Sequence, residues 1–195
     1  MIDNIAELYG ELTNYYNARY DEPNTLFLEH LREDFLKKQI KNYELLIKHY
    51  KKLDNVALVY TSDPIGLCSL LTSSKITIIC DHPLLERTKG FYKDRFNVDT
   101  KLINPLFNDI DYSEYDVLIF PEYEYFVPFD LVNNFKQNKD IAVFYSIDKS
   151  RYTPGHSMAL CVEDIEEMCN FTEEYSFGKY QFTSNIISYY GFGKR

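Results

Sequence analysis

The densest group of side chains that can do chemistry follows the apolar run at 116–120, where Glu122, Tyr123 and Glu124 come in succession. A carboxylate there can hold a substrate amine or accept a proton as a general base. If extended backbone continues past the run, Glu122 and Glu124 share one face and Tyr123 takes the other. These three are the candidate catalytic residues. The alternative is that they belong to a polar loop with no catalytic role.

Polar residues also follow three other short apolar runs, at 56–60, 75–80 and 100–103. In an open α/β sheet, ligands bind beyond the carboxyl ends of the strands, near the point where the strand order reverses. This rule selects four segments as candidate parts of a single site: 61–66, 81–83, 104–109 and 121–126. One histidine, His156, stands in a later turn-rich segment, as a catalytic base or as an exposed loop residue.

The elements that must position these segments alternate between strand and helix patterns. Short runs rich in β-forming residues stand at 56–60, 75–80, 100–103, 116–120 and 141–145, and helices are expected at 84–96, 126–137 and 163–169. This alternation indicates βαβ units around a buried parallel sheet. Two Tyr/Phe-rich strands within 175–192 predict an antiparallel edge. The predicted fold class is α/β, a doubly wound and mostly parallel sheet.

Helical spacing precedes the first strand. Residues 2–20 place apolar side chains on one stripe, and a long helix is expected at 25–53. Lysines line much of that long helix, as a solvated face or as a face for phosphate or a partner. We therefore divide the chain into a helical N-terminal cap at 1–54 and a Rossmann-like domain at 55–195. The cap covers a substrate pocket or serves as a homodimer or protein-partner surface.

Bulk properties exclude several classes of protein. The chain has 195 residues, enough for one domain and a small cap. Its net charge of −9 argues against a nucleic-acid partner, since phosphate binding needs basic surface. The four cysteines form no CxxC pair and are expected to be reduced core thiols, with no metal site. No apolar run approaches the ~20 residues of a membrane helix, so we expect a cytoplasmic protein with no membrane contact.

Several catalytic signatures are absent from the sequence. It has no phosphate-binding Gly-x-x-x-x-Gly-Lys-Ser/Thr loop and no Gly-x-Ser-x-Gly nucleophile turn. It also has no glycine-rich dinucleotide turn and no Asn-Pro-Pro-Tyr motif of amino-group DNA methylation. These absences argue against P-loop NTPases, α/β-hydrolases, nicotinamide or flavin enzymes, and methylation of adenine or cytosine in DNA.

The turn at 61–64 (TSDP), which an apolar helix follows, resembles the turn of the class I S-adenosylmethionine-dependent methyltransferases, including the nicotianamine synthase-like branch. That branch has a Gly-Ser-Gly-Pro turn, and the resemblance covers roughly residues 56–192. The serine and the proline match. Thr61 and Asp63 stand where the family has glycines that let the backbone approach the cofactor. Asp63 can crowd the methionine part of the cofactor, pair with its amino group or repel its carboxylate.

The resemblance implies a cofactor, S-adenosylmethionine, and a place for each part of it. Its methionine part would lie on the turn, its ribose hydroxyls would bind a carboxylate after the second strand, and its adenine would lie after the third. The residues so assigned are Thr61, Ser62 and Asp63 in the turn, Asp81 at the ribose, and Asn104 with Leu106 at the adenine. The loop that holds Glu122 to Glu124 would approach the transferred group.

Three functions stay open at this point. The first is a transferase that moves the methyl or aminocarboxypropyl group of S-adenosylmethionine to a small-molecule acceptor. The second is a methyltransferase-like interaction module that has lost cofactor binding. The third is a different doubly wound enzyme that acts on nucleotides or sugars. A fold alone does not separate them.

Overall fold

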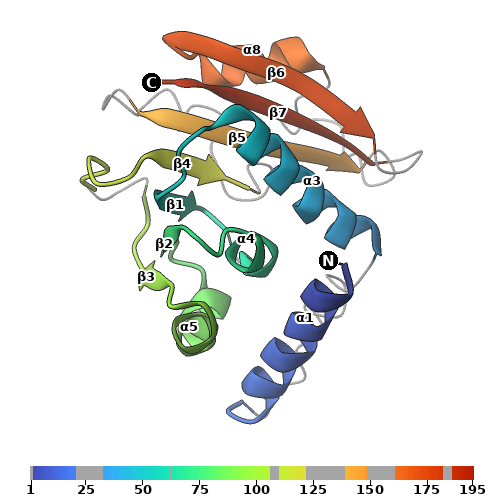
Figure 1. Ribbon diagram of the computed structural model, residues 1–195, viewed down its shortest axis with the longest axis vertical. Coiled ribbons are helices and arrows are strands. Elements are labelled where there is room, and N and C mark those ends of the chain that lie inside the picture. The colour runs from blue at the N-terminus through green and yellow to red at the C-terminus, as the bar shows by residue number, and fades with distance from the viewer. Residues whose placement is uncertain are drawn as a thin grey trace.

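A mostly parallel sheet of seven strands organises the computed structural model, which describes residues 2–20, 33–61, 63–105, 110–121, 139–148, 161–181 and 186–195. The strands are β1 (Asn55–Val59), β2 (Lys75–Ile79), β3 (Asp99–Lys101), β4 (Val117–Phe120), β5 (Asp140–Asp148), β6 (Glu173–Gln181) and β7 (Ile186–Lys194). Their spatial order is β3-β2-β1-β4-β5-β7-β6 (Figure 1). The predicted α/β class is confirmed.

The strand order reverses at β1. From β1 the chain moves outward through β2 to β3, and then crosses to β4 and β5 on the other side. Val56 accordingly faces Ile76 of β2 on one side and Val117 of β4 on the other, both in parallel register. The carboxyl ends of β1, β2 and β4 therefore meet at the switch point where ligands of open α/β sheets bind.

The central parallel strands are buried on both faces. Residues 56–59 of β1 and residues 117–120 of β4 are all at most 1% exposed. Strands covered on both faces appear in sequence as continuous apolar runs, which is why the predicted and observed strands nearly coincide. The far side of the sheet is different: β5 pairs with β7, and β7 with β6, in antiparallel register, as the Tyr/Phe-rich C-terminal pattern predicted.

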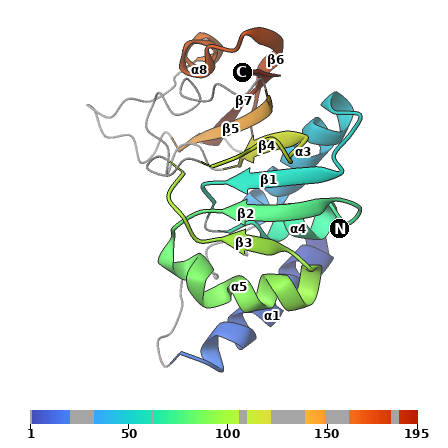
Figure 2. The ribbon, with the colours of Figure 1, turned by 90° about the vertical axis from the view of Figure 1, so that its left-hand side faces the viewer.

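Helices α1 (Ile2–Asn17), α3 (Glu33–His49), α4 (Ile65–Leu70) and α5 (Pro83–Phe96) pack against one another. Figure 2 shows α1, α3 and α4 on one side of the sheet, with α8 (Val162–Cys169) at the far end against β6 and β7. Buried side chains of α1 and α3 belong to the same hydrophobic core as β1. The N-terminal helices thus pack directly on the crossover helices that follow β1 and β2.

The expected long helix at 25–53 ends earlier than predicted, at His49. Apolar spacing continues to Leu53, but the residues at the helix end contact the sheet. The hydroxyl of Tyr50 donates to the carbonyl oxygen of Ile141 in β5 at 2.8 Å, and the ring of His49 stacks on Phe192 with centroids 4.6 Å apart. These contacts tie the helix end to the sheet, and the chain turns there into β1. Residues 21–32 of the expected helix lie outside the described residues.

Two further expectations can be compared with the structure. Cys68, Cys80 and Cys169 are buried free thiols, as expected for core cysteines, whereas Cys161 is only half-buried. The described helices include none that is long and apolar enough to cross a membrane. The predicted helix at 126–137 and the loop with His156 lie outside the described residues.

Candidate functional site

A chain of hydrogen bonds crosses the carboxyl ends of β1, β2 and β3. The Tyr60 hydroxyl, directly after β1, donates to Oδ1 of Asn104 at 2.5 Å. Nδ2 of Asn104, which follows β3, donates to Oδ2 of Asp81 at 2.9 Å, and Asp81 follows β2. The structure therefore brings together two of the predicted site residues, Asp81 and Asn104, and adds Tyr60, which the sequence analysis treated as the end of a strand.

Tyr60 has an unusual backbone. Its φ angle is 53°, in the left-handed region that favours glycine, and its N–H donates to the Ile79 carbonyl oxygen at 3.0 Å. A residue with a Cβ atom loses about 1–2 kcal/mol in this conformation. Of the described residues in this turn only Tyr60 has a positive φ, so Thr61 and Asp63 do not need the backbone freedom of a glycine.

The turn after Tyr60 is covered by the N-terminal helices. Thr61 is 0% exposed and Asp63 is 5% exposed, and the Asp63 amide donates to Oγ1 of Thr61 at 3.3 Å. The hydroxyl of Tyr9, on α1, donates to Oδ2 of Asp63. Nε2 of Gln39, on α3, donates to the Tyr9 hydroxyl oxygen at 2.8 Å. A buried polar cluster of Tyr9, Gln39 and Asp63 thus links both N-terminal helices to the turn.

Gly66 makes room for this cluster at the first turn of α4. A Cβ atom at this position would stand 1.4 Å from Oε1 of Gln39 and 2.9 Å from its Cβ. Only a residue without a side chain lets Gln39 lie here in its present conformation. Gly66, Gln39 and Tyr9 were not predicted as site residues, because the residues that meet in the cluster are far apart in the chain.

Burial controls the protonation of the groups around the turn. It raises the pKa of Tyr9 well above its usual value, and the neighbouring Asp63 carboxylate raises it further, so Tyr9 stays a neutral donor. Burial also raises the pKa of the Cys68 thiol, with a further contribution from Asp63, which disfavours a thiolate nucleophile. Burial lowers the pKa of His82, and the Asp81 charge opposes that shift.

Five of the predicted site residues lie outside the described residues: Ser62, Leu106, Glu122, Tyr123 and Glu124. Their assignment to the cofactor and to catalysis stays a prediction. In the part of the chain that is described, no three His, Cys, Asp or Glu side chains come together in a group that could hold a metal ion.

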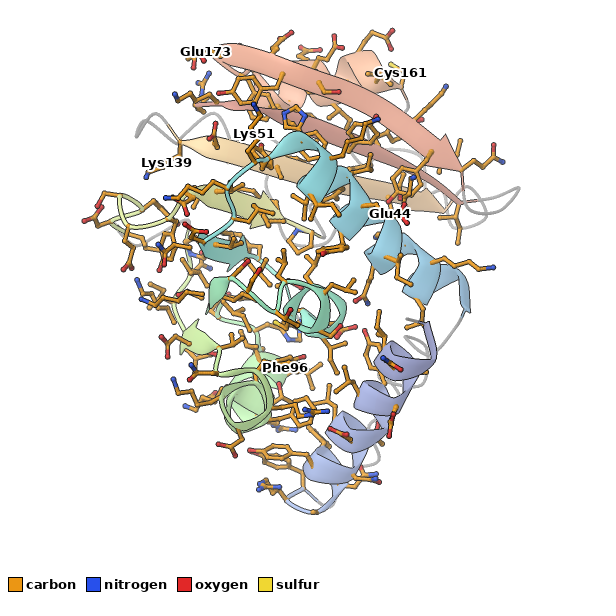
Figure 3. The ribbon with its side chains drawn as sticks, viewed as in Figure 1. Glu44, Lys51, Phe96, Lys139, Cys161 and Glu173 are labelled. Atoms are coloured by element: carbon orange, nitrogen blue, oxygen red, sulfur yellow. The ribbon has the colours of Figure 1, made fainter. Side chains whose placement is uncertain are left out.

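A hollow lies at the opposite end of the sheet from Asp81 and Asn104. It has a volume of about 690 Å³ and is lined by residues of α1, α4 and α5. One of them is Phe96, the last residue of α5, which Figure 3 labels. An ion pair between Arg95 and Glu11, 2.9 Å apart, joins two of its lining residues. None of the predicted site residues that the structure describes lines this hollow, because it lies at the amino-terminal ends of β2 and β3, opposite the switch point.

No protein-family model matches the chain, and no curated protein matches it in sequence. Its fold, however, matches solved structures. One is the N-methyltransferase NodS from Bradyrhizobium japonicum WM9, with a TM-score of 0.62 and 11% identity over 85% of this chain and 99% of that one. The structure of NodS in complex with S-adenosyl-L-homocysteine gives a TM-score of 0.61 and 11% identity over 95% of this chain and 98% of that one.

A second matched protein is the plantazolicin methyltransferase BpumL, in complex with a monoazolic substrate analogue and S-adenosylhomocysteine. It gives a TM-score of 0.57 and 10% identity over 99% of this chain and 98% of that one. At such identities the likeness is one of fold. The chain has the class I methyltransferase fold, as its turn at 61–64 suggested.

Proposed function

We propose that this chain binds S-adenosylmethionine and transfers its methyl group to a small-molecule acceptor. The observation that carries the proposal is the hydrogen-bonded chain of Tyr60, Asn104 and Asp81 across three neighbouring strand ends. It begins at Tyr60, directly after β1, where the strand order reverses and where open α/β sheets bind ligands. Transfer of the aminocarboxypropyl group is the other reaction open to the same cofactor.

The described residues fit the adenosine part of this cofactor. A ribose presents two vicinal hydroxyls, and a carboxylate can accept from both because it has two acceptor oxygens. Asp81 is exposed, and its Oδ2 atom is oriented by the Asn104 amide. Its Oδ1 atom accepts no hydrogen bond from the residues that the structure describes. Asp81 would therefore bind the ribose while Asn104 fixes the orientation of its carboxylate.

Methyl transfer needs little covalent chemistry from the protein. The cofactor, when bound, supplies an activated methyl group on a sulfonium, and much of the rate comes from the positioning of the acceptor. Glu122 or Glu124 would hold an acceptor amine or accept its proton, in the role predicted from their place after β4. The matched structures of NodS and BpumL support this function, since both are methyltransferases with the same fold and both were solved with S-adenosylhomocysteine.

A second candidate, an interaction module without cofactor, is favoured by a different observation. The turn that would hold the methionine part is covered by Tyr9 and Gln39, and the glycine-like position is held by Tyr60. If this cover does not open, the fold presents its surface to a protein partner and performs no transfer.

Calorimetric titration tests the two candidates against each other. The purified chain is titrated with S-adenosylmethionine and with S-adenosylhomocysteine, and the proposed function predicts saturable binding of both. Asp81→Ala should lower the affinity for both ligands by about tenfold or more, since it removes charge-assisted hydrogen bonds to the ribose. Asp94→Ala, an exposed aspartate on α5 at the other end of the sheet, serves as the control. Absence of binding by a well-folded sample would reject the transferase and leave the interaction module.

A further inference from the structure

The buried carboxylate of Asp63 lies at the opposite end of the same turn from Tyr60. Tyr60 reaches the exposed Asp81 through Asn104, while Asp63 lies beneath the N-terminal helices at 5% exposure. Three residues of extended chain span at most about 10 Å, so the two ends of the turn lie within reach of one small molecule. The turn thus connects at its Tyr60 end to Asp81, the candidate for the ribose hydroxyls, and carries a buried negative charge at its other end.

A ligand for such a turn needs hydroxyls at one end and a cation at the other. Buried carboxylates are stabilised by cations, and an ammonium that donates directly to the oxygens forms a strong, charge-assisted hydrogen bond. The amino-acid part of S-adenosylmethionine ends in a primary ammonium and a carboxylate. The charge of Asp63 attracts the first group and repels the second, so it selects one orientation of the amino-acid part.

We propose that Asp63 binds the ammonium group of the cofactor's amino-acid part, and that Tyr9 is the positioning residue that holds the Asp63 carboxylate. This inference rests on the proposed function. The Tyr9 hydroxyl donates to one oxygen of the carboxylate, and Gln39 fixes the Tyr9 hydroxyl from α3. A carboxylate offers about four acceptor positions, so it accepts an ammonium together with the Tyr9 hydroxyl. The N-terminal helices then contribute directly to cofactor specificity.

The test compares two ligands that differ in the amino-acid part. S-adenosylhomocysteine carries the ammonium, and 5′-methylthioadenosine shares the adenosine and the thioether but lacks the amino-acid part. Asp63→Asn should weaken the binding of S-adenosylhomocysteine by about tenfold or more and leave the affinity for 5′-methylthioadenosine within about twofold of its original value. Tyr9→Phe should give a smaller loss, also confined to S-adenosylhomocysteine. Asp94→Asn on α5 is the matched control, and circular dichroism verifies that each variant is folded.

The outcomes separate this inference from the proposed function. If the unmodified chain binds both ligands and Asp63→Asn weakens both equally or neither, the ammonium role is refuted and cofactor binding stands. If the unmodified chain binds neither ligand, the proposed function fails and the inference fails with it.

A second measurement does not depend on the folding of a variant. The unmodified chain is titrated with S-adenosylhomocysteine and with its analogue in which hydrogen replaces the amino group. The analogue should bind about tenfold or more weakly. Equal affinity would overturn the role of Asp63 in binding the ammonium.

Discussion

Removal of one oxygen atom, in Tyr9→Phe, should show how strongly the N-terminal helices are held on the turn. The change deletes the donor to the Asp63 carboxylate and the acceptor of the Gln39 amide, while the ring stays in place. A hydrogen bond to a charged group contributes about 1.5–3 kcal/mol, and a buried amide without its acceptor loses about 1 kcal/mol. Tyr9, Gln39 and Asp63 are each at most 7% exposed, so water cannot replace the lost partner.

We therefore expect Tyr9→Phe to lower the free energy of unfolding by about 2–4 kcal/mol, a large part of the roughly 5–15 kcal/mol typical of a domain. Urea unfolding followed by circular dichroism measures the change. Tyr43→Phe on α3 is the control, because the Tyr43 hydroxyl makes no hydrogen bond to the described residues.

The pH dependence provides a second check on the same variant. The pKa of Tyr9 is raised in the folded state, so its contribution is complete below the usual tyrosine value of about 10 and is lost only as the pH rises through the folded pKa. The loss in Tyr9→Phe should therefore stay constant from about pH 6 to about pH 9. A loss no larger than that of Tyr43→Phe would refute the assigned role of the cluster.

Three further changes test the described contacts by urea unfolding. Gly66→Ala places a Cβ atom 1.4 Å from Oε1 of Gln39, so it should lower the free energy of unfolding by about 1–3 kcal/mol. In a Gln39→Ala background most of that loss should disappear. An unchanged loss in that background would contradict the described packing of Gln39 on Gly66. Nδ1 of His82 accepts a hydrogen bond from the Leu84 amide in the first turn of α5 at 3.2 Å, and burial lowers the pKa of His82. Its contribution to stability is therefore complete above about pH 6.5 and is lost as the pH falls. His82→Asn should remove this part of the pH dependence of stability, and an unchanged dependence would exclude His82 as the helix cap. The backbone amide of Asn55, and then Lys52, hold the pKa of Asp116 below its usual value. Asp116→Asn should therefore lower the free energy of unfolding by about 1 kcal/mol near pH 7, but not well below about pH 3.9, where the carboxylate is protonated. An equal loss at both pH values would show that the charge of Asp116 does not contribute to stability.

The parallel part of the fold could be predicted because burial on both faces leaves a strong local pattern. The apolar run at 116–120 corresponds to β4 (Val117–Phe120), and the run at 75–80 to β2 (Lys75–Ile79). The pattern is weakest at the sheet edge, where β3 (Asp99–Lys101) is shorter than the expected strand and has no buried residue. A strand with one free edge needs fewer apolar side chains, so its sequence carries less information.

Only those site residues could be predicted whose place directly after a strand identifies them. Asp81 and Asn104 follow strand ends, and their side chains meet. Tyr60 was missed because an aromatic residue after a β-rich run is typical of a strand, and its left-handed backbone leaves no local signal. Tyr9 is separated from Asp63 by 54 positions and appeared in the sequence only as one more aromatic of a helix. Such contacts depend on tertiary packing, which residue periodicity does not contain.

The place of β7 has a consequence for the order in which the sheet assembles during synthesis. β7 follows β6 in the chain but lies between β5 and β6, with β5 paired to it along its full length. Within the described sheet, β6 is hydrogen-bonded to β7 alone. While residues 186–194 are still inside the ribosome, the nascent sheet ends at β5 and exposes the backbone N–H and C=O groups that later pair with β7, an edge that can pair with other chains. β7 closes this edge when it pairs with β5, and β6 joins the described sheet only through β7, so the last strand synthesised is needed before the one that precedes it can be added.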